Sequence, residues 1–293
     1  MIASHTELNG LKRQRPEWEP WLAVVEEILR ERGTPAWDVA VPADVTAGQA
    51  TIPLLTGATI ALEVKSVRRL LERLIRIASR SGPSKMATLP AALGADLEVL
   101  TLFAASVCQD GDPVKEVAAA CGADAEALQA VIALLPVPFL HACNRRWASS
   151  ISESWVEGYC PVCGSWPAFA EVRGIERSRY FRCGRCGGAW HARSLHCPYC
   201  AVDDHDALAS LVPQTAGSET VIDACTRCLG YVKTFTRLQG CAPDAVMLED
   251  LASIPFDVAA VEQGYTRPSG AGYPLEVRVI DKKAARRFFA WTT

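Results

Sequence analysis

Eight cysteines arranged in four pairs are the residues of this chain best suited to chemistry. Two residues separate the cysteines of each pair, and the segments 164–182, 187–196 and 201–224 separate successive pairs. The pairs are CPVC (Cys160, Cys163), CGRC (Cys183, Cys186), CPYC (Cys197, Cys200) and CTRC (Cys225, Cys228). A Cys-x-x-Cys loop directs two thiolates at one point, so two loops complete a tetrahedral four-sulfur shell for zinc or iron. The sequence therefore predicts two metal sites.

The order of the pairs predicts which of them share an ion. Sequential grouping gives a first site of Cys160, Cys163, Cys183 and Cys186 and a second site of Cys197, Cys200, Cys225 and Cys228. The enclosed segments, 164–182 and 201–224, have lengths that suit ribbons built from hairpins, and we therefore predict this grouping. A cross-brace would instead join the first pair to the third and the second to the fourth. The spacing separates neither zinc from iron nor a structural ion from a redox-active, rubredoxin-like iron site.

Residues within the loops fit metal knuckles. Gly164 and Gly187 directly follow the second cysteine of their pairs, a position that often requires a positive φ. Pro161 and Pro198 stiffen their loops by fixing φ. His191 and His196 could replace a thiolate, but eight cysteines suffice, so we assign both to the surroundings of the sites. The four other cysteines are predicted to be structural: Cys108, Cys121, Cys143 and Cys241.

Catalysis is not expected. CPYC also matches a thiol–disulfide oxidoreductase site, but that chemistry needs a cysteine at a helix N-terminus, and residues 201–224 show no helical pattern. A four-cysteine shell leaves no open coordination position for a substrate. The sequence also contains no nucleophile–base motif and no glycine-rich phosphate loop. We predict that the protein is not an enzyme.

The residues before the cysteines predict an all-α domain over residues 1–147. Apolar residues at helical spacing predict helices over 16–33, 62–80 and 91–108, followed by short helices that Asp112 and Asp124 can cap. Residues 1–15 are polar and predicted to be loosely held, and residues 33–60 are predicted to be irregular.

Helical periodicity fades at about Trp147, where cysteine, glycine and arginine become frequent. Short strands are predicted over 168–173, 179–182, 221–224 and 231–235, then a last helix over 245–262 and an irregular tail. The expected architecture is therefore multi-domain. Two small rubredoxin-like or zinc-ribbon domains, residues 148–196 and 197–293, follow the helical domain, and the second carries the C-terminal helix and tail.

Composition and hydropathy indicate the cellular compartment of the protein. The 293 residues are 49% apolar and 22% charged, as in ordinary globular proteins. The N-terminal residues have no apolar core of a signal peptide, and no apolar run approaches the length of a membrane span, so we predict a cytoplasmic protein without a membrane segment. In the reducing cytosol, paired cysteines more often hold metal than form disulfides.

Nucleic-acid binding is not expected either. The short helices over 112–135 look like a helix-turn-helix, but the second offers only Gln129 and no cation to read a base, so they are predicted to be a packing hairpin. The cysteine region is mildly basic, with eight arginines against four glutamates between Cys143 and Cys200, but thiolate charge cancels much of that excess.

Four stretches resemble the FdhE family of formate dehydrogenase accessory proteins. They are CPVCGSWP (160–167), FRCGRCGGAWHARSLHCPYC (181–200), DACTRCLGYVKTF (223–235) and LEDLASIPFDVAAVEQGY (248–265), the last similar to the family's terminal helix. Thr226 departs from the pattern, since the family often has an acidic residue there. All eight ligand cysteines are present.

The resemblance implies a cytoplasmic accessory or maturation factor that is required for respiratory formate dehydrogenase and binds its catalytic subunit. It also implies two rubredoxin-like folds that bind iron, which favours iron over zinc in the two sites. Arg177, Arg179, Arg182 and Arg193 are expected to be exposed beside the knuckles and are candidate partner contacts. The alternatives are a rubredoxin-like electron-transfer protein and a zinc-ribbon nucleic-acid-binding protein.

Overall fold

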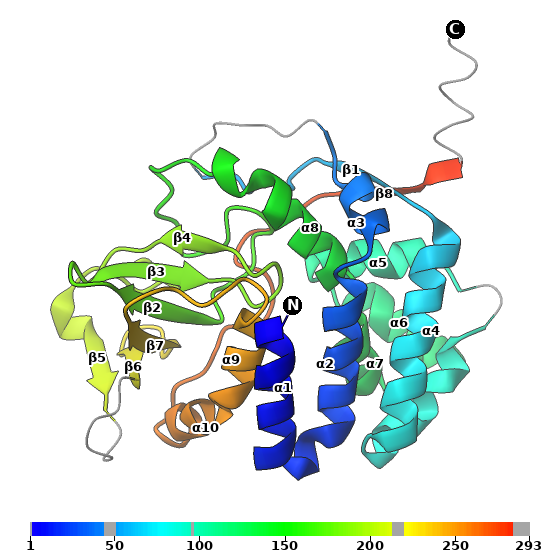
Figure 1. Cartoon of the computed structure of the whole chain (residues 1–293), viewed down its shortest axis with the longest axis horizontal. Coiled ribbons are helices and arrows are strands. Elements are labelled where there is room, and N and C mark those ends of the chain that lie inside the picture. Colours follow the sequence, from blue (N-terminus) through cyan, green and yellow to red (C-terminus); the bar gives the residue numbers. More distant parts are fainter. Residues whose placement is uncertain (1, 44–50, 95–96, 213–219, 284–293) are drawn as a thin grey trace, which may run out of the picture. The chain divides into compact units, whose positions relative to one another are not determined.

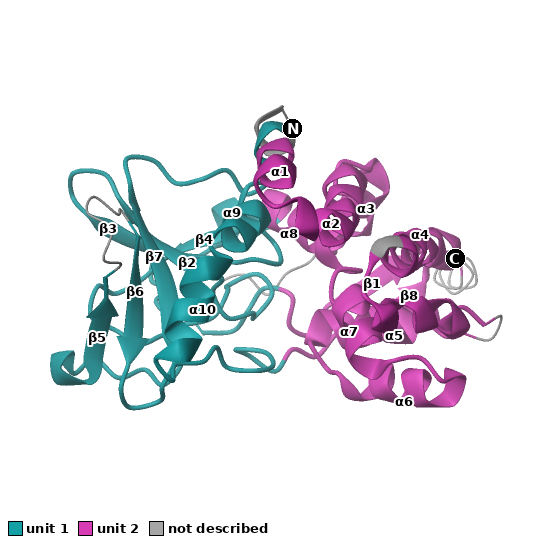
Figure 2. Ribbon diagram, turned by 90° about the horizontal axis from the view of Figure 1, so that it is seen from below, with its two compact units in different colours: residues 1–7, 46–54, 147–274 teal, residues 8–45, 55–146, 275–293 magenta. Residues whose placement is uncertain are grey.

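The computed structural model describes residues 2–43, 51–94, 97–212 and 220–283 (Figure 1). The chain divides into two compact units (Figure 2). The cysteine-rich unit comprises residues 1–7, 46–54 and 147–274, and the helical unit comprises residues 8–45, 55–146 and 275–293. The main change of unit falls at Trp147, where the sequence changes character.

Helices dominate the helical unit, as the apolar periodicity predicts. After α1 (Ile2–Gln14) and the 3-10 turn η1 (Pro16–Trp18), the helices are α2 (Glu19–Glu31), α3 (Pro35–Ala40), α4 (Val64–Ser81), the 3-10 helix η2 (Ser84–Ala92), α5 (Val99–Cys108), α6 (Asp112–Cys121), α7 (Ala125–Ile132) and α8 (Val137–Trp147). One parallel strand pair, β1 (Thr59–Leu62) with β8 (Arg278–Asp281), completes the described part of this unit.

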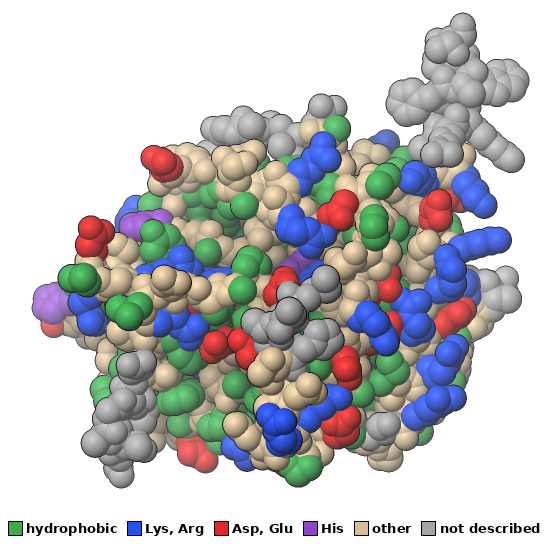
Figure 3. Space-filling model, viewed as in Figure 1, with side chains coloured by type: hydrophobic (Ala, Val, Ile, Leu, Met, Phe, Trp, Pro, Cys, Tyr) green, Lys and Arg blue, Asp and Glu red, His purple; other side chains and the backbone are tan. Residues whose placement is uncertain are grey.

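The longest of these helices, α4, shows how the sequence determines its orientation. Its apolar residues recur every three or four positions, and those on its inner stripe are buried: Val67, Leu71, Leu74 and Ala78. Its basic residues lie between them: Lys65, Arg68, Arg69, Arg73, Arg76 and Arg80. Figure 3 shows Lys and Arg side chains gathered over α4 at the right of this view. The helix therefore packs one face inward and presents a basic face outward.

Several local predictions in this half are wrong. Residues 1–15 were expected to be loosely held, yet α1 forms and buries Leu8 and Leu11. The helix expected over 91–108 begins only at Val99, because η2 ends at Ala92 and residues 93–98 are not helical where the structure describes them. The segment expected to be irregular after Gly33 contains α3 and β1.

The two expected helix caps have different outcomes. Asp124 caps α7, since its carboxylate accepts a hydrogen bond from the Ala127 N–H at 2.9 Å. Asp112 is instead the first residue of α6, and its carboxylate accepts from the Lys115 ammonium at 2.8 Å.

Replacing Asp124 should therefore destabilise the protein more than replacing Asp112. Asp124→Ala leaves an N–H of the first turn of α7 without its partner and should cost about 1 kcal/mol in the free energy of unfolding. Asp112→Ala removes only an exposed ion pair that solvent screens, and it should lower the free energy of unfolding much less than Asp124→Ala. Urea unfolding of both variants measures the difference, and equal losses would contradict the cap.

The apolar stretch around α7 and α8 is a core element. Among the described residues, the helical stretch Ala125–Ser150 is long and apolar enough to cross a membrane, yet 72% of its apolar window is buried within the protein. Burial of this extent is typical of a core helix. Val114, Ala118, Leu128 and Val131 are buried along α6 and α7, as expected for a packing hairpin.

Six described strands form one sheet in the cysteine-rich unit, in the spatial order β4-β3-β2-β7-β6-β5. They are β2 (Phe169–Arg173), β3 (Ser178–Arg182), β4 (Ala189–His191), β5 (Leu208–Leu211), β6 (Thr220–Cys225) and β7 (Tyr231–Arg237). The predicted strands all occur within β2, β3, β6 and β7, apart from Ala168, which directly precedes β2. The sheet also gains β4 and β5, which are too short to stand out in the sequence.

The sheet consists of two consecutive copies of one ribbon. In each copy, a Cys-x-x-Cys loop leads to two antiparallel strands, and a second such loop precedes the third strand. The copies β4-β3-β2 and β7-β6-β5 meet where β2 runs parallel to β7, with Phe169 opposite Lys233. The expected fold class, a helical region followed by two ribbon units and a C-terminal helix, is confirmed. The two ribbons nevertheless share one sheet.

The C-terminal helix is divided and fixed to this sheet by charge. It forms α9 (Val246–Ala252) and α10 (Ile254–Glu262), because Pro255 at the second position of α10 cannot donate to the preceding turn. Lys233, fully buried on β7, lies 2.7 Å from the Asp250 carboxylate and 2.8 Å from that of Asp257. Residues 275–283, expected to belong with the second ribbon, lie in the helical unit because β8 pairs with β1.

Candidate metal centres

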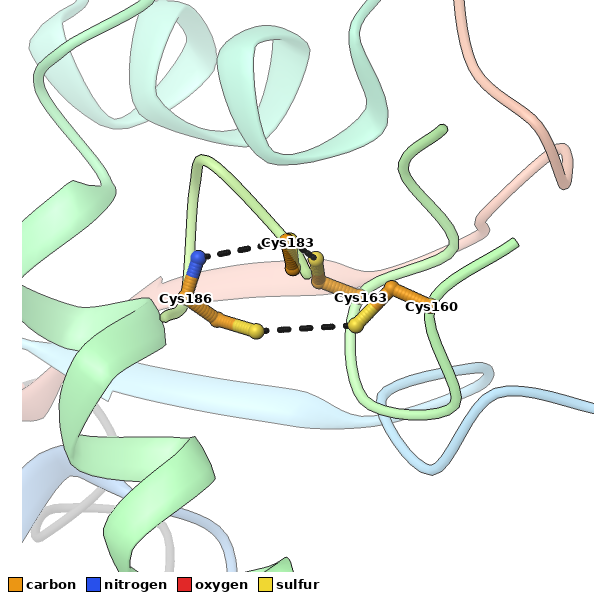
Figure 4. Close-up of side chains that lie close together, drawn as sticks. All are labelled: Cys160, Cys163, Cys183 and Cys186. Carbon is orange, nitrogen blue, oxygen red and sulfur yellow. Dashed lines mark hydrogen bonds between the residues drawn. The ribbon is translucent and has the colours of Figure 1, made fainter. Parts of the chain in front are cut away.

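The first predicted cysteine group forms a compact cluster, here called site 1 (Figure 4). Cys160 and Cys163 come from the loop before β2, and Cys183 and Cys186 come from the loop between β3 and β4. The Sγ atoms of Cys160 and Cys186 are 3.5 Å apart, as are those of Cys163 and Cys183. All four side chains are 0% exposed.

Local hydrogen bonds fold both loops of site 1 into the same turn. The Gly164 N–H donates to the Cys160 carbonyl at 2.9 Å, and the Gly187 N–H donates to the Cys183 carbonyl at 3.0 Å. Both glycines have a positive φ, 66° and 73°. This is the conformation that the glycines predict, and it turns the two sulfurs of each loop toward the partner loop.

The second predicted group forms an equivalent cluster, site 2, on the other ribbon. Cys197 and Cys200 precede β5, Cys225 is the last residue of β6, and Cys228 lies between β6 and β7. The Sγ atoms of Cys197 and Cys228 are 3.6 Å apart, and those of Cys200 and Cys225 are 3.7 Å apart. The structure thus brings the cysteines together in the predicted sequential grouping, and not as a cross-brace.

Both clusters have the dimensions of a tetrahedral metal shell. A metal–sulfur distance of about 2.3 Å gives a regular tetrahedron with sulfur–sulfur edges of about 3.8 Å. The four sulfurs of each cluster all lie within 4.8 Å of one another. None of the twelve cysteines, all in the described part of the chain, is in a disulfide. The donor sets therefore fit zinc or iron, and they would hold it through these eight thiolates.

The electrostatics of site 1 also require a cation for full ionisation. Burial raises the pKa of Cys160 well above its usual value, and contact with the other three thiols raises that of Cys186. Hydrogen bonds from Cys160, Cys183 and Cys186 hold the pKa of Cys163 well below it. Four thiols at this separation cannot all ionise by themselves. A divalent ion supplies the charge that makes all four thiolates.

The two histidines lie outside both clusters. His191 is exposed on β4, with its ring centroid 5.7 Å from that of Tyr180. His196 is buried, and its Nδ1 has no hydrogen-bond partner among the described residues. Burial lowers the pKa of His196. Of the other cysteines, Cys143 is buried in α8, and Cys108, Cys121 and Cys241 are half-buried.

Two of the four expected contact arginines are not at the surface. Arg177 and Arg193 are exposed, whereas Arg179 and Arg182 are only 5% and 2% exposed. Arg179 donates to the Asp223 carboxylate at 2.8 Å and to the backbone carbonyl of Arg193 at 3.2 Å. Arg179 and Arg182 therefore stabilise the interior of the unit and are excluded as partner contacts.

Arg182 belongs to a buried ionic cluster that the sequence did not predict. Its guanidinium donates to the Glu171 carboxylate at 3.0 Å and to the carbonyls of Cys241 and Gly187, at 2.7 and 3.1 Å. Glu171 is 0% exposed and also lies within 3.3 Å of Arg173 and Arg237. The cluster links β2, β3 and β7 across the junction of the two ribbons and reaches the second loop of site 1.

Part of the sequence is similar to known FdhE proteins. No protein-family model matches the sequence. The chain is 33% identical over 154 residues to an FdhE homolog of Pseudomonas aeruginosa, covering 46% of this chain and 50% of that protein. It is 33% identical over 120 residues to an FdhE homolog of Aquifex aeolicus and 31% identical over 113 residues to the FdhE protein of Escherichia coli. These alignments cover 39% and 38% of this chain and 41% and 36% of the relatives.

The fold agrees over nearly the whole chain. The crystal structure of the FdhE protein from Pseudomonas aeruginosa superimposes with a TM-score of 0.54 at 20% identity, covering 92% of this chain and 94% of that one. The chain is FdhE-like in sequence and fold. The sequence alignments span half or less of the length of these relatives. Sequence therefore supports the resemblance over that part of the FdhE-like chain, and the superposition supports the fold over nearly all of it. The predicted resemblance is confirmed.

Proposed function

We propose that this chain is a cytoplasmic accessory factor for the maturation of a respiratory formate dehydrogenase and binds its catalytic subunit. The observation that carries the proposal is the pair of four-cysteine clusters on one sheet of an FdhE-like fold. Four cysteine ligands fill the coordination shell and leave no vacant position for a substrate, so the clusters suit a binding protein better than an enzyme. The partner enzyme, a formate dehydrogenase, is inferred from the resemblance to FdhE, and the same resemblance favours iron as the ion.

The metal would serve to hold a binding surface in shape. The strands of the ribbons are short, from three residues in β4 to seven in β7. One hydrophobic cluster on the sheet consists of just four buried residues: Ala168, Phe169, Phe235 and Val246. Small units of this kind gain much of their folding free energy from the metal. The exposed Arg177, in the turn between β2 and β3, and the exposed Arg193, after β4, are the candidate contacts that remain.

Deleting the gene should abolish formate oxidation by the respiratory enzyme of the host. The wild-type gene should restore the activity, and a tagged chain should co-purify with the catalytic subunit. The matched pair Cys183→Ser and Cys121→Ser tests the role of the clusters, because only the first removes a cluster ligand. Formate oxidation that survives the deletion would refute the proposal.

The exposure of Cys228 supports one second candidate, a rubredoxin-like electron-transfer protein, because an exposed ligand shortens the path to a partner. That function predicts iron with a thiolate-to-iron absorption that bleaches on reduction. A colourless protein with two zinc ions after anaerobic purification from the host would exclude electron transfer. It would leave the accessory function intact.

A further inference from the structure

The two clusters differ in the solvent exposure of their cysteines. All four cysteines of site 1 are 0% exposed, including Cys186, the last in sequence. In site 2, Cys197 and Cys225 are buried, Cys200 is half-buried, and Cys228 is exposed. Cys186 and Cys228 occupy the same position in their ribbons, so the difference in exposure arises from the residues around them.

Site 1 is enclosed by the chain after α10. The Tyr273 N–H donates to the Gly164 carbonyl at 2.9 Å, which fixes this segment against the first knuckle. The approach is close, because a Cβ on Gly272 would lie 2.6 Å from Tyr159 and 3.0 Å from Gly164. On the other side, the Ser165 hydroxyl lies 3.4 Å from Cys163 Sγ and accepts from Arg185.

Site 2 has strained and open knuckles. Ala201 and Leu229 stand where site 1 has Gly164 and Gly187, with φ of 60° and 57°. A non-glycine residue in this left-handed region costs on the order of 1 kcal/mol. Leu229 is 51% exposed beside Cys228, and Thr226 and Arg227 in the same loop are also exposed.

Site 2 also borders a cavity of about 110 Å³. Cys197 and Cys225 line it, together with Pro198 and Tyr231. Two ligands of site 2 thus face a hollow, and a third faces solvent. Gly230, behind Cys228, is held by close contact, since a Cβ there would lie 2.4 Å from the Tyr199 ring. The Cys228 side is therefore the open route to site 2.

We propose that site 2 is an exchangeable metal site, open to an external thiolate or another soft ligand at Cys228, whereas site 1 is permanently closed. The inference rests on the proposed binding of metal by both clusters. An incoming thiolate forms a bond to the ion as the bond from Cys228 breaks, and the released Cys228 takes a proton from solvent. No electrons are transferred. Site 2 would thus pass its ion to a thiol-bearing partner or receive it from one.

Metal release from the full-length chain tests the proposal. Protein loaded with two zinc ions is mixed with an excess of the chromogenic chelator 4-(2-pyridylazo)resorcinol. We expect one ion to leave at least about tenfold faster than the other, a difference of about 1.4 kcal/mol in the barrier. Two ions that leave at one common rate would overturn the proposal.

Two matched variants show which site produces the fast phase of metal release and which produces the slow phase. Cys228→Ser should remove the fast phase and leave one slowly released ion, and Cys186→Ser should remove the slow phase. A fast phase that survives Cys228→Ser would overturn the assignment to site 2.

Alkylation of the wild-type protein gives a second measurement, which does not depend on the folding of any variant. Zinc-loaded protein treated with iodoacetamide should be modified at Cys228 before any site 1 cysteine, as mapped by mass spectrometry. Equal or earlier modification of Cys186 would overturn the inference. A chain that binds no metal at all would refute the proposed metal centres and this inference together, whereas equal release rates from loaded protein refute this inference alone.

Discussion

Cys160→Ser should lose one metal ion per chain and unfold the ribbon around site 1. Cys160 is 0% exposed, and its sulfur lies 3.5 Å from that of Cys186. A serine hydroxyl is a poor ligand for a soft ion, and without the ion the three remaining cysteines lose the bonds that join the two loops. Structural zinc binding is worth about 10–16 kcal/mol in isolated zinc-finger peptides, so the loss is as large as the whole stability of a typical domain, about 5–15 kcal/mol.

Metal analysis and limited proteolysis measure this effect. The variant should bind one ion where the wild type binds two, and cleavage should begin in the segment 160–190. The helical signal in circular dichroism should largely persist, because the helical unit has its own core, including Leu22, Phe103 and Phe139. Cys121→Ser is the control, since this half-buried cysteine lies outside both clusters. A Cys160→Ser protein with two ions and unchanged protease resistance would contradict the role of site 1.

The cysteine clusters were predictable because their information is local. A Cys-x-x-Cys loop needs only a few residues to direct two sulfurs, and Gly164 and Gly187 reveal the turn that follows. Each loop then finds its partner across one short hairpin. The parallel contact of β2 with β7 instead joins strands from different ribbons, and nothing in either strand specifies its partner. The sequence therefore predicts two ribbons but not their union in one sheet.

The burial of two arginines was not predicted for a related reason. Arg179 and Arg182 were assigned to the surface because isolated arginines are rarely buried. Their partners, Asp223 and Glu171, lie 44 and 11 residues away and become neighbours only in the folded sheet. The available signal was the alternation of a strand, which places Arg179 on the same face as the apolar Phe181, and both are buried. Strand β8 was not predicted either, since its partner β1 lies in the first quarter of the chain and β8 near its end.

Glu171→Gln should cost about 3–5 kcal/mol in the free energy of unfolding, because it removes the anion of a buried charge cluster. Glutamine has nearly the same shape as glutamate and can still accept the Cys241 N–H that now donates to Glu171 at 2.9 Å. Arg182, 2% exposed, would however keep its charge and lose its carboxylate partner. The loss should be visible in urea unfolding at pH 7. Glu176→Gln, at an exposed turn between β2 and β3, is the matched control and should change stability by less than about 0.5 kcal/mol.

The pH dependence of this difference identifies its cause. Burial by itself raises the pKa of Glu171, but Arg182, the Cys241 N–H and Arg173 outweigh it, so the pKa lies below its usual value of 4.5. A carboxylate with a depressed pKa stabilises the fold fully above the pKa of the unfolded chain and loses that contribution as pH falls through its folded value. Wild type and Glu171→Gln should therefore differ most at neutral pH. The difference should begin to shrink below about pH 4.5 and vanish as the pH falls through the lower folded pKa of Glu171, where Glu171 becomes a neutral acid. A difference that stays constant down to acid pH would mean that shape and packing, and not charge, make Glu171 necessary.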